Sequence, residues 1–505
     1  MAERRRLPVT CAPMVLFMTA FCALSVFQSL LLQELRLRER CGGHADDARC
    51  DLDRVASLAM FDDAAAKLAW AVPSMLVSGS GGALADARGK RPPMMVACAG
   101  GVVYSAGLAA VARWRLSHAW VWASALGFGA SGGYALFAAM TFALLGELAT
   151  GEARADAFTK NEAAIYVGLL VGPAIAGAVA GAVSFAVASL GCAALFGAAW
   201  LWVGLALEEA PSFLRRAERR RRRRRRARDA ASAGLGARLV ASADDAEPDA
   251  EPKDDEADDA PWWRTNSFTL VAAIWRRERR LVKLGRKSCA KVWLSFALFN
   301  AQAAGITFVI VLFVKDEFGF SNAMIGGLVS AVGVAAVFGL VALVPAMRAA
   351  LGRAPRELEI LRAGALAAAA FNGSWAALVP RAWAPWATLP IESVAGGALP
   401  HFRTVLANAA RPEHQGTTLA AAGILEILPQ CYMGFVVSGA FATCSGIFPG
   451  APCAVIGAFG LASYCCLCGL REEDLPIADH MDDADTDARV GFNTADGDNS
   501  ASAAS

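Results

Sequence analysis

Two acidic residues lie where a charge is costly, in the middle of long apolar stretches. Glu392 falls within the stretch 384–407, and Glu426 falls within the stretch 415–442. If these stretches cross a bilayer as helices, an ionised acid near the centre costs about 2.5–3.5 kcal/mol, so it must face a cavity, be neutral or be paired. We predict that both residues line a path for a solute or a proton. Either could instead be a protonated, hydrogen-bonded structural acid.

Uncharged polar residues in other apolar stretches are weaker candidates for the same path. Each of them could equally satisfy a hydrogen bond between two helices, which is common in helix bundles. The four candidates are Gln28, Tyr134, Asn300 and Gln302.

Further charged residues lie nearer the ends of the apolar stretches. Lys67 follows Asp63 at the i+4 position, which favours an ion pair at the outer rim rather than a substrate site. His401 and Arg403 lie near the inner end of the stretch 384–407. They could gate an inner opening or contact lipid head groups.

No group of residues has the spacing of a known catalytic or metal centre. The chain has 5 His, and its Cys and His residues do not cluster at metal-ligand spacing. The glycines of 79–82 lack the strand-to-helix context of a phosphate-binding loop. We therefore expect neither an enzyme nor a cofactor or metal.

Most of the 13 cysteines lie in apolar stretches, where a free thiol packs as a small apolar group. Two pairs differ, because they flank or share a predicted outer loop. Cys41 with Cys50, and Cys444 with Cys453, could each close a short loop in an oxidising compartment.

The elements that position these residues follow from composition and hydropathy. The chain of 505 residues is 56% hydrophobic and 19% charged, and its mean hydropathy is +0.41. These values exclude a soluble enzyme and indicate a membrane protein. A helix needs about 20 apolar residues to cross a bilayer. Twelve stretches qualify: 9–33, 58–84, 92–112, 118–146, 157–182, 184–207, 290–314, 321–348, 357–379, 384–407, 415–442 and 448–470.

The twelve stretches form two halves of six, 1–207 and 288–470. A charged linker at 208–287 separates them, and an acidic tail at 471–505 follows. We expect the tail and most of the linker to be disordered, with an amphipathic helix near 267–287 on the membrane surface. The arginine run at 215–228 could bind anionic lipids, and we expect no nucleic-acid partner.

The distribution of Lys and Arg predicts the orientation in the membrane. Most of the 48 Lys and Arg residues fall in the linker and in the loops on the same side, which places both termini and the linker in the cytoplasm. The first outer loop departs from this rule because it carries five arginines between Arg36 and Arg54.

The segment between the second and third stretches reads G-A-L-A-D-A-R-G-K-R from Gly82 to Arg91. Gly89 permits a tight turn, and Lys90 and Arg91 hold the loop on the cytoplasmic side. The string resembles the loop signature G-x-L-x-D-x-x-G-[RK]-[RK] of the major facilitator superfamily. The resemblance implies that Asp86 contacts the start of the eleventh helix near 415–418.

Further passages resemble the same superfamily. They are Glu147 with Arg154 after the fourth stretch, the fifth-helix pattern of Gly168, Gly172, Pro173 and Gly177, and the inner loop at 411–416. Within the superfamily the chain resembles the tetracycline-efflux-like and hippocampus-abundant-transcript-like branch, with the folate-carrier-like branch as a near competitor. The residues that carry this resemblance are the inner loops, 318–321 and 448–452.

The resemblance implies an all-α fold of two six-helix bundles around a cavity lined by the first, fourth, seventh and tenth helices. It also implies a monomeric secondary transporter of a small solute, which could be coupled to protons through Glu392. Antiporters of this superfamily commonly carry an arginine in the fourth helix, whereas 122–139 here has no basic residue. A membrane receptor or scaffold that keeps the fold without transporting remains the alternative.

Overall fold

The computed structural model describes residues 2–41, 52–148, 152–180, 182–209, 289–351, 357–408, 415–444 and 446–471, with a few isolated positions between 213 and 280. The described residues are almost entirely helical and contain no strand. The C-terminal tail and most of the linker, including nearly all of the predicted amphipathic segment, lie outside the described residues.

The first half of the chain forms seven helices, which we call the N-terminal bundle. They are α1 (Ala2–Cys41), α2 (Leu52–Arg88), α3 (Arg91–Trp114), α4 (Ala119–Ala130), α5 (Gly133–Leu148), α6 (Glu152–Ala180) and α7 (Phe185–Leu205). The helices α4 and α5 share the fourth predicted span. The sequence predicted one helix there, but Gly132 and Gly133 have positive φ values of 87° and 49°, which interrupt it.

The second half forms the C-terminal bundle, whose spans are more often broken. Its helices are α10 (Ala290–Glu317), α11 (Asn322–Phe338), α12 (Val344–Leu351), α13 (Glu357–Leu378), α14 (Ala384–Ala387), α15 (Leu389–Gly396), α16 (Ala398–Asn408), α17 (Gln415–Ile427), α18 (Met433–Cys444) and α19 (Ala451–Cys468). A π-helical turn (Gly339–Leu343) joins α11 to α12, and a 3-10 turn (Leu428–Cys431) lies between α17 and α18. The tenth span is split into α14, α15 and α16.

Prolines lie at several of these breaks. Pro385 and Pro390 fall in the first turns of α14 and α15, where a proline without an N–H group can begin a helix but not continue one. Pro429 lies in the 3-10 turn between α17 and α18. Non-helical backbone at membrane depth is tolerated where protein or a water-filled cavity surrounds it.

Every predicted span has a helical counterpart, and the all-α fold is confirmed. Within the described residues, nine helical segments are long and apolar enough to cross a membrane. The three other predicted spans are α2, which carries Asp62, Asp63 and Lys67, then α13, and then the split tenth span.

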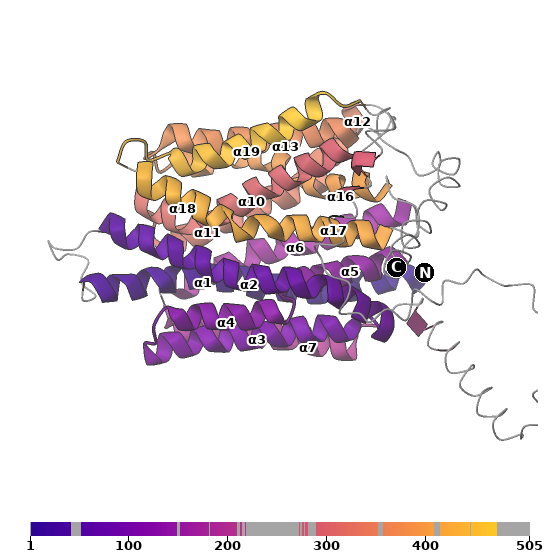
Figure 1. Ribbon diagram of the computed structural model, residues 1–505, viewed down its shortest axis with the longest axis horizontal. Coiled ribbons are helices and arrows are strands. Elements are labelled where there is room, and N and C mark those ends of the chain that lie inside the picture. The colour runs from indigo at the N-terminus through magenta and orange to yellow at the C-terminus, as the bar shows by residue number, and fades with distance from the viewer. Residues whose placement is uncertain are drawn as a thin grey trace, which may run out of the picture.

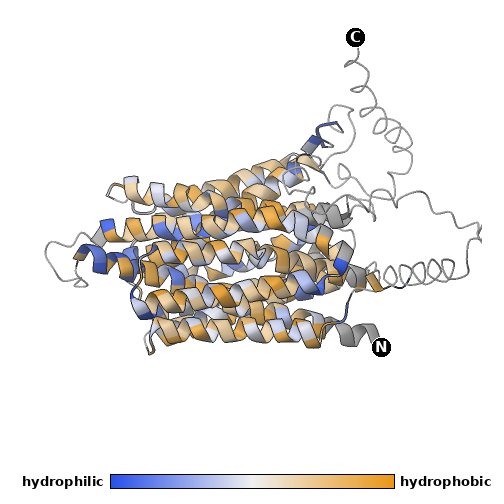
Figure 2. Cartoon of the chain, turned by 60° about the horizontal axis from the view of Figure 1, so that its bottom comes forward, coloured by the Kyte–Doolittle hydropathy of each residue, from blue (hydrophilic) through white to orange (hydrophobic). Residues whose placement is uncertain are grey.

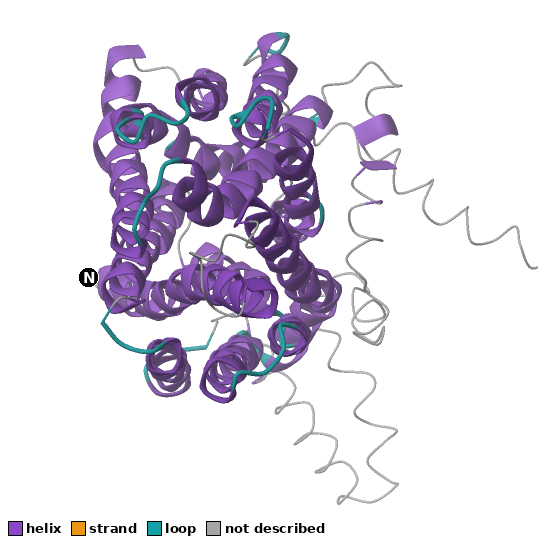
Figure 3. Ribbon diagram, turned by 90° about the vertical axis from the view of Figure 1, so that its left-hand side faces the viewer, coloured by secondary structure: helices purple, strands orange, loops and turns teal. Residues whose placement is uncertain are grey.

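The helices run side by side along the long axis of the molecule, with the two bundles in separate layers (Figure 1). Figure 3 shows the same helices nearly end-on. Apolar residues cover most of the helix length, and polar residues gather toward the helix ends (Figure 2). One large apolar core extends through both bundles, and a smaller one around Phe296 and Phe402 lies within the C-terminal bundle. This arrangement is that of an integral, multi-pass membrane protein.

The bundles meet most closely where α6 packs against α11. A Cβ atom added to Gly177 would lie 2.8 Å from the Cα of Gly326, so neither position has room for a side chain. On its other face α6 packs on α1, where a Cβ on Gly168 or Gly172 would meet the α1 backbone. Pro173 lies inside α6 between these contacts.

Candidate functional site

Six polar residues from both bundles gather in the middle of the molecule, and we call them the central cluster. The N-terminal bundle contributes residues from α5 and α6, and the C-terminal bundle contributes residues from α15, α16 and α17. The members are Tyr134, Glu162, Tyr166, Glu392, Arg403 and Glu426.

Arg403 on α16 is the cation of the central cluster. Arg403 is 4% exposed. Its Nε and Nη2 donate to the two carboxylate oxygens of Glu426 on α17, each at 2.8 Å. The guanidinium carbon lies 4.6 Å from the ring centre of Phe142 on α5, and Tyr134 shares a hydrogen bond with the same guanidinium. A bidentate pair of this kind is strong and fixes the orientation of both side chains.

Glu162 joins the two bundles through the same guanidinium. It lies on α6, is 1% exposed, and its carboxylate forms an ion pair with Nη1 of Arg403. One arginine of the C-terminal bundle therefore contacts one carboxylate of its own bundle and one of the opposite bundle. Any motion that separates α6 from α16 breaks the second contact.

Glu392 on α15 differs from the other acids of the cluster because it is unpaired. Its Oε2 is enclosed, and no donor within the described residues reaches it. Tyr166 of α6 lies within electrostatic range of Glu392 and Glu426, and its hydroxyl donates to the carbonyl of Gly396 at 3.1 Å. Gly396 follows Glu392 at i+4, which places both residues on one side of α15.

The other predicted path residues lie elsewhere. Gln28 donates from Nε2 to Asp63 Oδ1 at 2.7 Å and accepts from the Tyr104 hydroxyl. Asn300 donates from Nδ2 to the carbonyl of Phe296, one turn back on α10, at 2.9 Å. Gln302 is buried on the same helix. Of the four uncharged candidates, Tyr134 is the one that the structure brings to Glu426.

The ion pair predicted between Asp63 and Lys67 forms, but it is buried between the bundles and not at the rim. Lys67 Nζ lies 2.9 Å from Asp63 Oδ2, and the two residues are 6% and 1% exposed. The ammonium group also donates to the carbonyl of Thr307 on α10 at 3.2 Å and lies 3.7 Å from the ring centre of Phe308. The i+4 spacing predicted the partner, whereas the neighbouring bundle that encloses the pair is not visible in the sequence.

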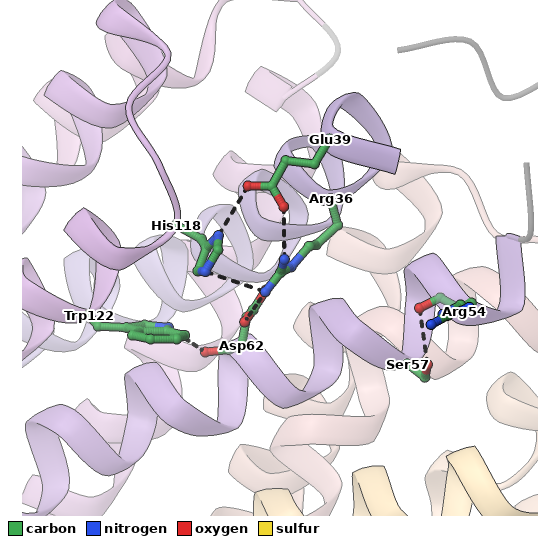
Figure 4. A network of polar contacts seen from close by, with 7 residues as sticks. All are labelled: Arg36, Glu39, Arg54, Ser57, Asp62, His118 and Trp122. Atoms are coloured by element: carbon green, nitrogen blue, oxygen red, sulfur yellow. Dashed lines mark hydrogen bonds and ion pairs between the residues drawn. The ribbon is translucent and has the colours of Figure 1, made fainter. Parts of the chain in front are cut away.

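A second polar network joins the C-terminal end of α1 to the N-terminal part of α2 (Figure 4). Arg36 donates from Nη2 to Asp62 Oδ1 and from Nη1 to Glu39 Oε2, both at 2.8 Å. His118 contacts Glu39 through Nδ1 at 3.2 Å, and Trp122 donates to the carbonyl of Asp62 at 3.2 Å. These contacts tie α1, α2 and the start of α4 together within the N-terminal bundle.

The segment that resembles the family loop is mostly helical, which corrects the predicted loop. Gly82 and Asp86 belong to α2, which continues to Arg88, and two residues, Gly89 and Lys90, form the turn. Gly89 has a φ of 96°, and a Cβ there would meet a carboxylate oxygen of Glu209 at 2.5 Å.

The turn is held by the end of the N-terminal bundle. Glu209 accepts the backbone N–H groups of Lys90 at 2.7 Å and of Arg91 at 3.3 Å, at the start of α3. Arg91 donates from Nε to the carbonyl of Val203 at 3.2 Å. A carboxylate at a helix N-terminus is favoured by the free N–H groups and the helix dipole. The side chains of Asp86, Glu147, Arg154 and 415–418 lie outside the described residues.

The predicted cysteine pairs differ in outcome. Cys41 is disulfide-bonded, and its partner lies outside the described residues. Cys444 and Cys453 are free thiols, so the predicted bridge across the last outer loop is absent. Cys453 is fully buried in the apolar core, whereas Cys444 is half-buried and contacts Thr443. The two thiols thus face different surroundings.

Glu162 and Tyr166 were not among the residues predicted from the sequence, and the role of Arg403 was open. An acid inside the fifth apolar stretch was the available signal for Glu162. Nothing in the sequence predicted that the side chain of Arg403 points inward, because an arginine near a helix end can reach lipid head groups as readily as the protein interior. His401 also turns inward, where its Nδ1 contacts the carboxylate of Glu357. Within the described residues, no group of three or more His, Cys, Asp or Glu could hold a metal ion.

Comparison with known proteins identifies the fold. The model of the Major Facilitator Superfamily matches residues 9–432. The human organic anion transporter MFSD10 has a similar structure, with a TM-score of 0.62 and 18% identity over 92% of this chain and 100% of that chain. The xylose transporter XylE of E. coli has a TM-score of 0.56 and 14% identity over 91% of this chain and 97% of that chain.

A transporter of the POT family, solved with 5-aminolevulinic acid, has a TM-score of 0.57 and 12% identity over 91% of this chain and 95% of that chain. No curated protein sequence matches this chain.

Proposed function

Because the chain belongs to the Major Facilitator Superfamily, we propose that it is a secondary active transporter that moves a small solute by alternating access. The observation that carries this proposal is the central cluster, in which both bundles contribute charged residues to one buried site. A protein that served as a scaffold alone would gain nothing from charges buried at that depth, where each is costly.

Contacts between the bundles at two levels support the alternating-access part of the proposal. Arg403 with Glu162, and Tyr166 with the Gly396 carbonyl, join the bundles at the central cluster. Lys67 contacts the Thr307 carbonyl in a second, separate group. Single hydrogen bonds and ion pairs of this kind contribute a few kcal/mol at most, so rocking of one bundle against the other can exchange them.

We assign proton coupling to Glu392. Its enclosed Oε2 has no donor within the described residues, so the carboxyl group has nothing but a proton or an incoming cation to balance its charge. A group that takes up a proton from one side and releases it to the other links solute movement to the proton gradient.

The similar structures do not specify the solute. They include an organic anion transporter and a xylose transporter, which handle chemically different solutes on one fold. Fold similarity at this level of identity supports the transport cycle and not its cargo.

Uptake by purified protein in proteoliposomes tests the proposed function. The protein is reconstituted, and counterflow of labelled solutes is measured over a panel of organic cations, anions and neutral compounds. We expect saturable exchange of at least one solute class above protein-free vesicles. A protein that binds solutes but exchanges none of them across the membrane would be a receptor or scaffold, and the proposal would be wrong.

Replacement of Glu392 tests the coupling separately. Glu392→Gln mimics a permanently protonated acid, so accumulation driven by a proton gradient should be lost while exchange of labelled for unlabelled solute persists at saturating solute concentration. The exposed Glu359→Gln, on α13, is the matched control and should accumulate solute normally. Normal accumulation by Glu392→Gln would show that this carboxyl group is structural.

A further inference from the structure

The central cluster carries more negative than positive charge. Its carboxyl groups are those of Glu162, Glu392 and Glu426, and its cation is the guanidinium of Arg403. No second cation within the described residues forms an ion pair with any of the three acids. When all three are ionised, the cluster holds two uncompensated negative charges in the membrane interior.

The guanidinium of Arg403 already faces two carboxylates. Two of its nitrogens donate to both oxygens of Glu426, a third faces Glu162, and one face of the guanidinium covers Phe142. An anion would have to displace a buried carboxylate and leave it unpaired, which is strongly unfavourable. The arginine therefore holds the two acids in place and is not a binding site for a negative solute.

Glu392 has the opposite character, since it offers an acceptor that nothing fills. Its Oε2 is enclosed without a donor, and the Tyr166 hydroxyl donates to the carbonyl of Gly396, one turn after Glu392 on α15. An aromatic ring and a carboxylate together form the surroundings that recognise an ammonium group.

We propose that the solute is an organic cation, a small protonated amine whose ammonium group binds the carboxylate of Glu392 beside Tyr166. This inference rests on the proposed transport function and adds the substrate class. The amine and the coupling proton then compete for one carboxylate, since each neutralises the same charge. Binding of one displaces the other, which is the requirement for exchanging an amine against a proton.

Thermal unfolding of the purified full-length protein in detergent tests the substrate class without relying on transport. Ligands are offered as matched sets on ring and chain scaffolds that differ in charge alone, such as benzylamine, benzyl alcohol and benzoate. A ligand that binds the folded state raises the unfolding temperature. We expect the amines to stabilise the protein and the matched alcohols and carboxylates to have no effect.

Two variants test whether the amine binds at Glu392. Glu392→Gln should lower the affinity for the stabilising amine at least about tenfold, the loss expected when one charged hydrogen-bond partner is removed. Glu359→Gln should bind it as the unmodified protein does. Stabilisation by carboxylates or alcohols instead of amines, undiminished amine binding in Glu392→Gln, or no stabilisation by any member of the panel would each overturn the proposal.

The outcome is separable from that of the proposed function. Saturable exchange of neutral or anionic solutes, but not of amines, would keep the transporter and reject the cationic substrate. Amine binding that depends on Glu392, in a protein that exchanges no solute, would keep the site and reject transport.

Discussion

At the scale of single residues, the central cluster depends on the guanidinium of Arg403. Glu162 is buried and Glu426 is mostly buried, and both contact it. A carboxylate buried without a partner is costly, so each acid is tolerated because the arginine is present. The cluster is therefore a unit, and removal of one member changes the surroundings of the others.

A double-mutant cycle tests this dependence. Arg403→Met leaves two buried carboxylates unpaired and should lower stability by about 3–5 kcal/mol, the usual loss when one partner of a buried pair is removed. Glu426→Gln removes one of those charges, so the double variant should be more stable than the sum of the single effects by at least about 1 kcal/mol. Denaturant or thermal unfolding in detergent measures the three variants. Strictly additive effects would show that Arg403 and Glu426 do not act together.

At the scale of elements, the seam between α6 and α11 decides how closely the bundles approach. Gly177 and Gly326 face each other with no side chain between the helices, and a Cβ on Gly333 would lie 2.7 Å from the Leu170 backbone nitrogen. Small residues at a helix interface allow backbones to come close, which favours association in a membrane. The glycines of α6 and α11 therefore serve packing between bundles.

Alanine substitutions at matched glycines test the seam. Gly177→Ala places a Cβ 2.8 Å from Gly326 Cα, so the helices must move apart, and we expect a loss of about 1–3 kcal/mol. At Gly191 on α7 nothing lies within 4 Å of an added Cβ, so Gly191→Ala should be neutral or stabilising by up to about 1 kcal/mol through helix propensity. Thermal unfolding of both variants makes the comparison. Equal unfolding temperatures would show that the seam tolerates separation.

At the scale of the whole molecule, two groups of contacts hold the bundles together. One is the central cluster, and the other surrounds Lys67 and includes the contact of Lys315 Nζ with Gln33 Oε1 at 2.7 Å. Both groups consist of side chains from α1, α2 or α6 that meet side chains or carbonyls of the C-terminal bundle. A transport cycle must release and restore such contacts without unfolding either bundle.

Orientation in the membrane is a further property of the whole molecule. An even number of spans and the excess of Lys and Arg on one side predict that both termini and the linker 208–287 are cytoplasmic. Trypsin added outside sealed right-side-out vesicles should spare the linker, although it contains the longest arginine run of the chain. Cleavage after Arg49 in the predicted first outer loop, seen on reducing gels, is the internal control. Fragments that end within 208–287 would show that the linker is outside and that the predicted orientation is wrong.

The sequence determined the parts of this protein that depend on one helix at a time. Apolar stretches of about 20 residues predicted all twelve spans because the bilayer selects each span by its own hydropathy. The buried acids at Glu392 and Glu426 were visible for the same reason. The family was visible too, since the string from Gly82 to Arg91 lies in one continuous segment.

The tertiary structure decided which of these residues meet. Hydropathy along one helix does not report which face turns inward, so Glu162 and Tyr166 were missed, and the contact of Gln28 with Asp63 on α2 could not be predicted. Arg403 lies near a helix end, yet its long side chain reaches Glu162 and Glu426 on two other helices. Lys67 was assigned to the rim because its contact with Thr307 joins residues 240 positions apart. Contacts between bundles depend on how both pack, and no single stretch of sequence contains that information.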